Sequence, residues 1–373
     1  MARIPRACIW GLLLLGLTAL GTACGQPPPW RLGFLGGLSG RVADLGVDGR
    51  NGAMLAVERQ NAAGGVGGRS LELIARDDGQ EPEMARRATS ELLGLGVEAI
   101  IGPMTSSMAM AALPLLKDTP TVMVSPTVTT TQLMGLDDNF LRVISTTADY
   151  AGKSARYQRQ RQGRSRAAVI YDLDNASYTQ SWLDDFQRAF EHLGGQVVKT
   201  LPYTSGDDRT FLPAARELLA AGPDLVVAVT NAVDAALICQ QVRRLDPRMP
   251  LAMSEWASTE RFLELAGAAA EGVCVPQFLN RNDTSERYQA FRRDYQRRFG
   301  QDPGFGALAG YDAARVVIET LSRRQAGQGL KEAVIALKSF QGLQQVINID
   351  QYGDADRATY ITEIRDGQYL TLE

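Results

Sequence analysis

A short loop of small residues carries the first side chains that could do chemistry. The apolar run 97–101 leads into Gly102-Pro103-Met104-Thr105-Ser106-Ser107, and a helical pattern of apolar residues begins at Met108. A buried strand that runs through such a loop into a helix brings backbone N–H groups and hydroxyls together, an arrangement that favours an anion. No lysine follows as in a phosphate-binding P-loop, so a small carboxylate fits better than a nucleotide phosphate. The alternative is that Ser106 only caps the helix.

Catalytic and metal-binding patterns are absent from the sequence. The single histidine, His192, lies in a helical pattern without a second histidine, a Cys-x-x-Cys pair or other metal-ligand spacing. Neither Gly-x-Ser-x-Gly nor the dinucleotide-binding fingerprint is present. Asp172 and Asp174 are close enough for acid–base chemistry, but they are better explained as residues that shape a loop after a strand. We therefore expect no catalytic residues, no metal and no cofactor.

The N-terminus has the layout of a secretory signal. Arg3 and Arg6 precede an apolar run over 9–20, which is too short to span a bilayer, and small residues follow. This pattern predicts a signal peptide over 1–23 and export from the cytoplasm to the periplasm or the cell surface.

Cys24 follows the small residues directly and predicts a lipid anchor. The segment before it resembles a bacterial lipobox, although Gly21 stands where leucine is typical and Leu20 lies one step earlier. Residues 24–30 are rich in proline and form an extended tether, so we expect the protein to contact the membrane through this lipid. The alternative is an ordinary secreted protein with a spare cysteine.

Composition excludes some partners and bounds the architecture. The formal net charge is −3, and removing Arg3 and Arg6 with the signal peptide lowers it to −5, which argues against nucleic acid. The remaining chain of about 350 residues exceeds one typical core, so two domains are expected. Beyond Cys24 only Cys239 and Cys274 remain. Both fall in apolar patterns and are predicted to be buried and unpaired, with a disulfide as the alternative.

Strand and helix patterns alternate along the chain in two successive sets. The first set has strands expected at 31–37, 71–75, 99–101 and 121–124, with helices at 48–61 and 81–95; the second has strands at 167–171, 197–201, 225–229 and 251–253, with helices at 178–193, 211–221 and 233–245. Two such sets predict two parallel-sheet α/β lobes. Ligands of these sheets lie beyond the carboxyl ends of the strands, so both lobes can face one cleft.

An ordered series of short motifs resembles the type I periplasmic binding proteins, in particular the leucine/isoleucine/valine-binding branch that serves branched-chain amino acid ABC transporters. The motifs are Asn51-Gly52-Ala53, residues 61–69, Asp77-Asp78, Ile101-Gly102-Pro103, Ser125-Pro126-Thr127, Gly222-Pro223-Asp224, residues 310–313 and residues 350–354. The resemblance implies two doubly wound parallel-sheet lobes joined by a three-strand hinge, which close on a ligand. It places lobe 1 at 31–145 plus 277–356 and lobe 2 at 146–276 plus 357–373.

The resemblance also implies which residues bind the ligand. In the family, a serine and a threonine of the first lobe hold an amino-acid carboxylate; the matching residues are Ser106 and Thr129, with backbone groups of Thr127 beside them. An acidic residue of the second lobe holds the ammonium, and Glu255 matches it directly after a strand. A local turn for Thr129 and a helix-capping role for Glu255 are the alternatives.

Among the other cleft positions, one matches the family pattern and the rest differ from it. Tyr178 matches a cleft tyrosine, although a packed aromatic is an equal alternative. Asn231 replaces a family tyrosine, Leu45 replaces a tryptophan, and Trp256 adds an aromatic wall. The groups that recognise the amino-acid main chain are therefore expected to be retained in a changed side-chain pocket, so an amino acid is better supported than leucine.

We expect a receptor without enzymatic activity that delivers an amino acid or a close relative to an ABC permease. The alternative is a lipoprotein sensor or regulatory interaction module with the same fold.

Overall fold

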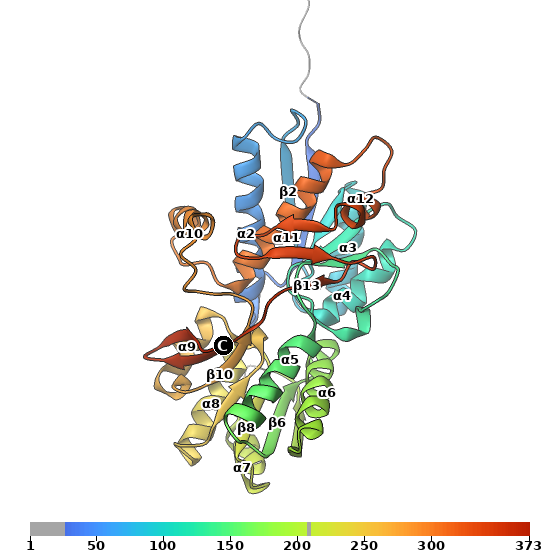
Figure 1. Ribbon diagram of the computed structural model, residues 1–373. Helices are drawn as coiled ribbons and strands as arrows, with labels where there is room; N and C mark the ends of the chain where they lie inside the picture. Colours follow the sequence, from blue (N-terminus) through green and yellow to red (C-terminus); the bar gives the residue numbers. More distant parts are fainter. Residues whose placement is uncertain (1–26, 207–209) are drawn as a thin grey trace, which may run out of the picture.

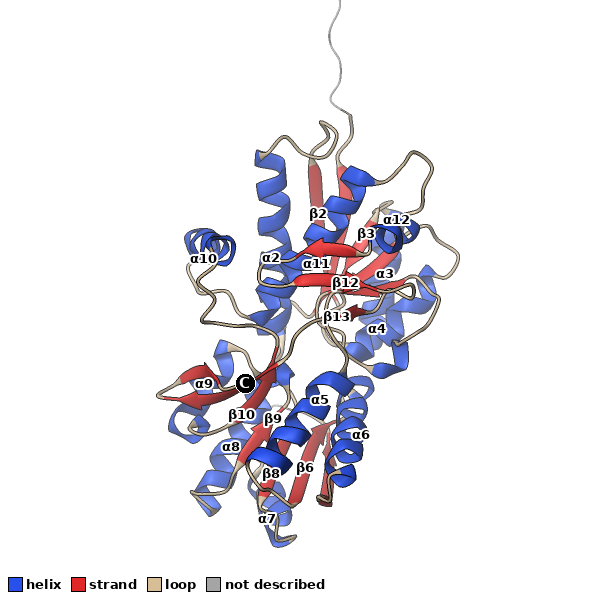
Figure 2. Ribbon diagram, viewed as in Figure 1, coloured by secondary structure: helices blue, strands red, loops and turns tan. Residues whose placement is uncertain are grey.

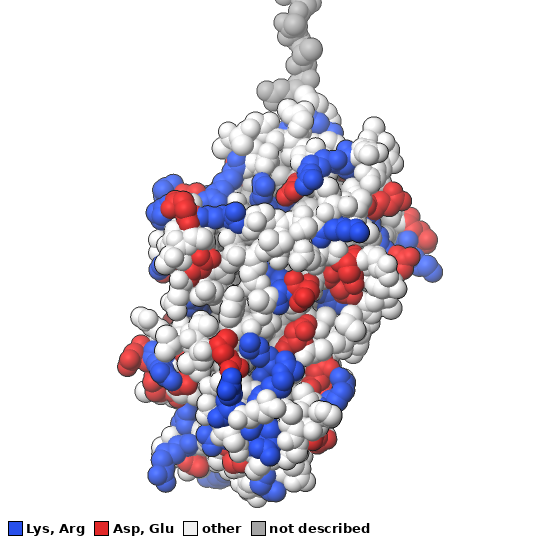
Figure 3. All heavy atoms as spheres, viewed as in Figure 1, with Lys and Arg blue, Asp and Glu red and all other residues white. Residues whose placement is uncertain are grey.

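The computed structural model describes residues 27–206 and 210–373, arranged as two lobes that lie one above the other (Figure 1). The predicted signal peptide and Cys24 lie outside the described residues. Within the described part, no helix is long and apolar enough to cross a membrane. Acidic and basic side chains are spread over both lobes, and lysine and arginine gather on the face of the second lobe that carries α5 (Figure 3).

The first lobe is built on a five-stranded sheet in the order β2-β1-β3-β4-β5, with every neighbouring pair parallel. Its strands are β1 (Trp30–Gly36), β2 (Leu71–Asp77), β3 (Ala99–Ile101), β4 (Val122–Ser125) and β5 (Phe140–Arg142). The helices of this lobe are α2 (Ala43–Ala62), α3 (Pro82–Gly94), α4 (Ser106–Ala112), α10 (Glu286–Phe299), α11 (Phe305–Arg323) and α12 (Leu330–Leu337). A small antiparallel sheet of β11 (Ser339–Gln341), β12 (Val346–Ile349) and β13 (Ala355–Asp356) completes it.

The second lobe is built on a seven-stranded sheet in the order β15-β14-β10-β9-β8-β6-β7 (Figure 2). Its strands are β6 (Arg166–Asp172), β7 (Gln196–Tyr203), β8 (Leu225–Val229), β9 (Leu251–Met253), β10 (Cys274–Gln277), β14 (Tyr360–Arg365) and β15 (Gln368–Thr371). Its helices are α5 (Thr147–Arg156), α6 (Ala176–His192), α7 (Leu212–Ala220), α8 (Ala232–Leu245) and α9 (Glu260–Ala266). The expected two-lobe α/β fold is confirmed, and the structure adds an antiparallel hairpin, β14–β15, which the alternation of strands and helices did not predict.

Helix α2 begins five residues before its predicted start, and its glycines lie against neighbouring backbone. A Cβ atom at Gly52 would lie 1.9 Å from the carbonyl oxygen of Ala307, and one at Gly310 would lie 2.1 Å from that of Gly49. The glycines therefore let α2 and α11 pack at backbone contact, a role that periodicity of large apolar residues does not reveal.

The chain crosses between the two large sheets three times, and Arg357 ties the crossings together. Its backbone N–H donates to Ser145 Oγ at 2.8 Å, and its guanidinium donates to the carbonyl of Val143 at 3.3 Å on the first crossing. The same guanidinium lies 4.7 Å from the centre of the Phe278 ring on the second crossing and pairs with buried Asp312 at 3.0 Å. The three segments therefore meet around one buried cation.

Candidate ligand site between the lobes

A closed cavity lies where loops at the carboxyl ends of strands in both lobes meet. It is lined by Leu45, Met104, Thr105, Ser106, Thr127, Thr129, Ile144, Asn175, Tyr178, Glu255, Trp256 and Phe305. The space open to the centre of a water-sized sphere is about 20 Å³, enough for about one water molecule. Asn175 accepts a hydrogen bond from the backbone N–H of Ser107 at 3.0 Å, and Thr131 and Ser181 hydroxyls lie 2.9 Å apart, so the lobes are in contact around the cavity.

The first lobe contributes two hydroxyls that have no hydrogen-bond partner. Ser106 Oγ and Thr129 Oγ1 are both buried, each residue being 1% exposed, and neither oxygen is paired. The Thr127 hydroxyl differs, because it donates to the carbonyl of Met104 at 2.6 Å. Ser125 Oγ donates to the carbonyl of Pro103 at 2.9 Å and so joins the two loops that carry Ser106 and Thr129. The loops hold two unpaired donors at the cavity.

The second lobe contributes a buried carboxylate. Glu255 stands two residues after the end of β9 and is 5% exposed. Its Oε2 accepts a hydrogen bond from the indole Nε1 of Trp182 at 3.0 Å, while its Oε1 has no partner. The hydroxyl of Tyr178 is also buried and unpaired, and the Tyr178 ring packs edge-on against Trp256 with centroids 5.7 Å apart.

Burial raises the pKa of Glu255 to about 7, against the lowering effect of its own backbone N–H and of nearby donors on Tyr178, Trp182 and Thr129. Of these three side chains, only Trp182 makes a hydrogen bond to the carboxylate in the structure. The residues that line the cavity include no lysine, arginine or histidine. A buried carboxylate that faces donors but no cation could pair with a positively charged group.

Asn231 lies outside this cavity, contrary to the sequence expectation. Its side-chain oxygen accepts from the backbone N–H of Asp234 at 3.0 Å and caps α8, which explains why an asparagine stands at this strand–helix junction. It belongs to an outer chamber of about 640 Å³ that also includes Arg41, Asp172 and Ser205. Trp256 lines both spaces, so it separates the closed cavity from the outer chamber.

Sequence patterns missed other residues that line the cavity or contact its lining. Phe305 comes from the start of α11, and Trp182 reaches Glu255 from α6, 73 positions away. Only Asn175 carried a local signal, as a polar residue just before a helical pattern. Residues that meet only through tertiary packing leave no such trace.

The remaining thiols are unpaired, as predicted, but only one of them is buried. Cys239 is buried in α8, whereas Cys274 is partly exposed at the first position of β10. Burial raises the pKa of Cys239 to about 12 and that of Cys274 to about 11, so both thiols are protonated at neutral pH.

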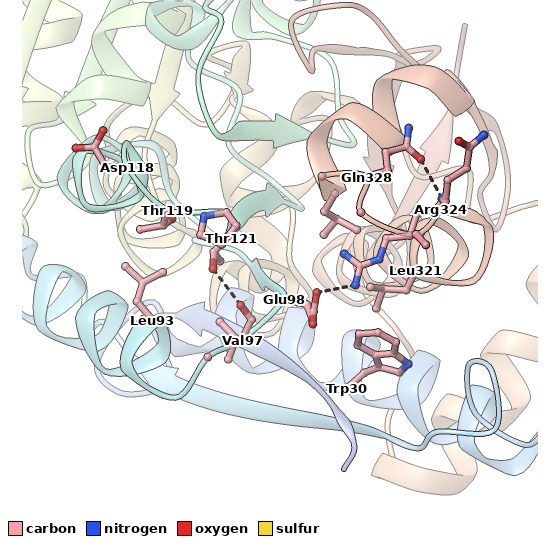
Figure 4. Close-up of a pocket in the computed structure, with 17 residues that line it drawn as sticks. Trp30, Leu93, Val97, Glu98, Asp118, Thr119, Thr121, Leu321, Arg324 and Gln328 are labelled. Atoms are coloured by element: carbon pink, nitrogen blue, oxygen red, sulfur yellow. Dashed lines mark hydrogen bonds and ion pairs between the residues drawn. The ribbon is translucent and has the colours of Figure 1, made fainter. Parts of the chain in front are cut away.

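A larger surface depression, about 910 Å³, lies elsewhere, at the amino ends of β1, β3 and β4 (Figure 4). Some of its polar groups pair with one another: Arg324 pairs with Glu98 at 3.0 Å, and Thr121 donates to the carbonyl of Val97 at 3.0 Å. Ligands of parallel sheets bind at the carboxyl ends of the strands, and the unpaired groups lie there. The closed cavity is therefore the candidate site.

Comparison with known proteins gives consistent likenesses over nearly the whole described chain. The family model described as "Periplasmic binding protein" matches residues 29–368. The Leu/Ile/Val-binding protein homolog 3 of Brucella melitensis is 27% identical over 257 residues, 68% of each chain. A leucine binding protein from Thermotoga maritima superposes with a TM-score of 0.84 at 23% identity, covering 92% of this chain and 97% of that one. A solute binding protein of an ABC transporter from R. palustris, in complex with benzoate, gives 0.83 at 21% identity, covering 92% and 95%.

Proposed function

The chain belongs to the periplasmic binding protein family, and from that premise we propose that it captures an α-amino acid between its lobes and delivers it to an ABC permease. The observation that carries the proposal is a set of unpaired groups in one closed cavity. Ser106 Oγ and Thr129 Oγ1 come from the first lobe, and Glu255 Oε1 comes from the second. Because buried polar groups are normally paired, the gathering of these unpaired groups in one cavity supports a ligand that pairs with them.

A zwitterion supplies both kinds of partner. Its carboxylate accepts hydrogen bonds from the hydroxyls of Ser106 and Thr129, and its ammonium meets the carboxylate of Glu255. The two ends of one small molecule then contact opposite lobes, so binding favours the closed arrangement over an open one.

The ammonium end separates this proposal from a simple carboxylic acid. Benzoate, present in the R. palustris relative's structure, has a carboxylate but no positively charged group. Burying such a ligand beside Glu255 would leave two negative groups in one cavity or would require Glu255 to stay protonated. The leucine binding protein from Thermotoga maritima is the better functional guide, since a leucine zwitterion carries both charges.

The cavity walls favour a small aliphatic side chain. Leu45, Met104, Ile144 and Phe305 form the apolar part of the lining. With the lobes as close as they are, the space of about 20 Å³ holds about one water molecule, so any amino acid requires wider separation of the lobes or movement of these walls. A larger side chain would require more of this movement than a small one.

The deciding experiment compares amino acids with acids that lack only the amine. Protein without residues 1–23 is titrated calorimetrically with alanine, valine and leucine, and in parallel with propionate, isovalerate and 4-methylpentanoate; benzoate is included. We expect heat of binding and a raised melting temperature with at least one amino acid, because a ligand of the native state stabilises it. Equal or tighter binding of a matched acid or of benzoate would overturn the amino-acid assignment.

A further inference from the structure

A second set of contacts between the lobes lies at the rim of the cleft between them, outside the cavity that holds the unpaired groups. Arg41, two residues before α2 in the first lobe, pairs with Asp234 of α8 in the second lobe at 2.5 Å. The Asp234 side chain has no exposed surface, and that of Arg41 is 26% exposed. This ion pair is therefore largely removed from water, unlike the surface pairs of the molecule.

The second lobe surrounds Asp234 with donors that carry no charge. Tyr203 donates its hydroxyl hydrogen to Asp234 at 3.0 Å, and Asn231 donates from its amide at 3.1 Å. A second buried carboxylate, Asp172, lies close by, since Ser205 Oγ contacts both acids. One hydroxyl hydrogen cannot serve both carboxylates at once. Among the described contacts of these two acids, the positive charge comes from Arg41 of the opposite lobe.

The same segment of the first lobe makes a neighbouring contact of opposite polarity. Asp44, in the first turn of α2, accepts a hydrogen bond from the hydroxyl of Thr259 in the second lobe at 2.6 Å. Leu45, the next residue, lines the closed cavity. Residues 41–45 therefore join two rim contacts to one wall of the ligand site.

From these contacts we propose that Arg41 and Asp234 form a latch that holds the lobes closed without ligand, with Arg41 as a positioning residue for the cavity. Opening would withdraw the guanidinium of Arg41 and leave Asp234 beside Asp172, where the described neighbouring side chains supply only neutral donors. The closed arrangement is then populated before ligand binds. The ligand then adds a second connection between the lobes, because it contacts Ser106 and Glu255 inside the cavity.

Small-angle scattering of the ligand-free protein without residues 1–23, refolded from denaturant to remove bound solute, tests the latch. Arg41→Ala is expected to increase the radius of gyration of the unliganded protein. The matched control Arg86→Ala, which removes an exposed arginine paired within the first lobe with Glu83, should leave it unchanged. An Arg41→Ala profile identical to wild type would overturn the proposal.

Chemical rescue separates the latch from nonspecific loosening. Methylguanidinium added to Arg41→Ala can occupy the place of the missing guanidinium beside Asp234 and should restore the compact profile. In Asp234→Asn the carboxylate is absent, so the same additive should have no effect. Rescue of both variants, or of neither, would overturn the proposal. Because no amino acid is used, the outcome is independent of the amino-acid assignment.

Discussion

The indole of Trp182 donates to one carboxylate oxygen of Glu255 at 3.0 Å and leaves the other oxygen without a partner. The hydrogen bond fixes the orientation of a buried acid whose remaining oxygen lies in a cavity without a protein cation. This relationship makes Glu255 the residue on which the proposed recognition depends most.

Replacing Glu255 should weaken amino-acid binding more than any other single change in the cavity. Glu255→Ala leaves the ligand ammonium buried without a counter-charge and is expected to cost about 2–5 kcal/mol of binding free energy, measured by calorimetry with the best ligand. Glu264→Gln, at an exposed acid of the same lobe, is the control and should bind like wild type. Unchanged affinity in Glu255→Ala would contradict the assigned role.

The serine on the opposite lobe should have a smaller effect. Ser106→Ala removes one donor to a charged carboxylate and should cost about 1.5–3 kcal/mol in the same titration. Thr129→Val removes the second donor while keeping nearly the same shape, so a loss of similar size is expected. Full affinity in both variants would place the ligand carboxylate elsewhere.

Binding should strengthen as pH rises through about 7. In the empty protein, burial raises the pKa of Glu255 from 4.5 to about 7, so its folded state binds more protons than its unfolded state between these values. The contribution of Glu255 to stability therefore falls as pH rises from about 4.5 to about 7 and is constant above. An ammonium ligand favours the ionised carboxylate, so its thermal shift should grow from pH 5 to pH 8, and Glu255→Gln should remove that growth. A flat wild-type response would contradict the pairing.

Contact between α2 and α11 should tolerate no added atom at Gly52. A Cβ atom there would lie 1.9 Å from the Ala307 carbonyl oxygen, so Gly52→Ala must push the helices apart and should cost about 1–3 kcal/mol in urea unfolding. Gly94→Ala, in α3 with open space around the new carbon, is the control and should change stability by no more than about 1 kcal/mol. Equal stability of the two variants would show that α2 and α11 can move apart without loss of stability, which would contradict the prediction.

Anchoring through Cys24 is tested in cells. Wild type should fractionate with membranes and carry a lipid on its first mature residue, whereas Cys24→Ser should be released or retained as precursor. Mass spectrometry of the mature N-terminus checks this, and an unmodified cysteine on a fully soluble protein would contradict it.

Local sequence determined much of this protein because strand ends and helix starts are encoded by neighbouring residues. Apolar runs located most strands and the loop that carries Ser106, and the resemblance to the family added Thr129 and Glu255; the structure brings all three residues to one cavity. Ligand-binding positions can be recognised at strand ends because the carboxyl ends of parallel strands face the ligand side of a sheet.

Tertiary structure alone decided which side chains meet across the cleft. Asn231 has the same strand-end position as Glu255, yet capping of α8 holds it in the outer chamber. Phe305 reaches the cavity, and Arg41 reaches Asp234, only because the lobes close with one relative placement. Both contacts depend on long-range packing that no local pattern encodes: the glycine contacts of α2 with α11 position α11 within the first lobe, and the crossings that meet at Arg357 join the two lobes.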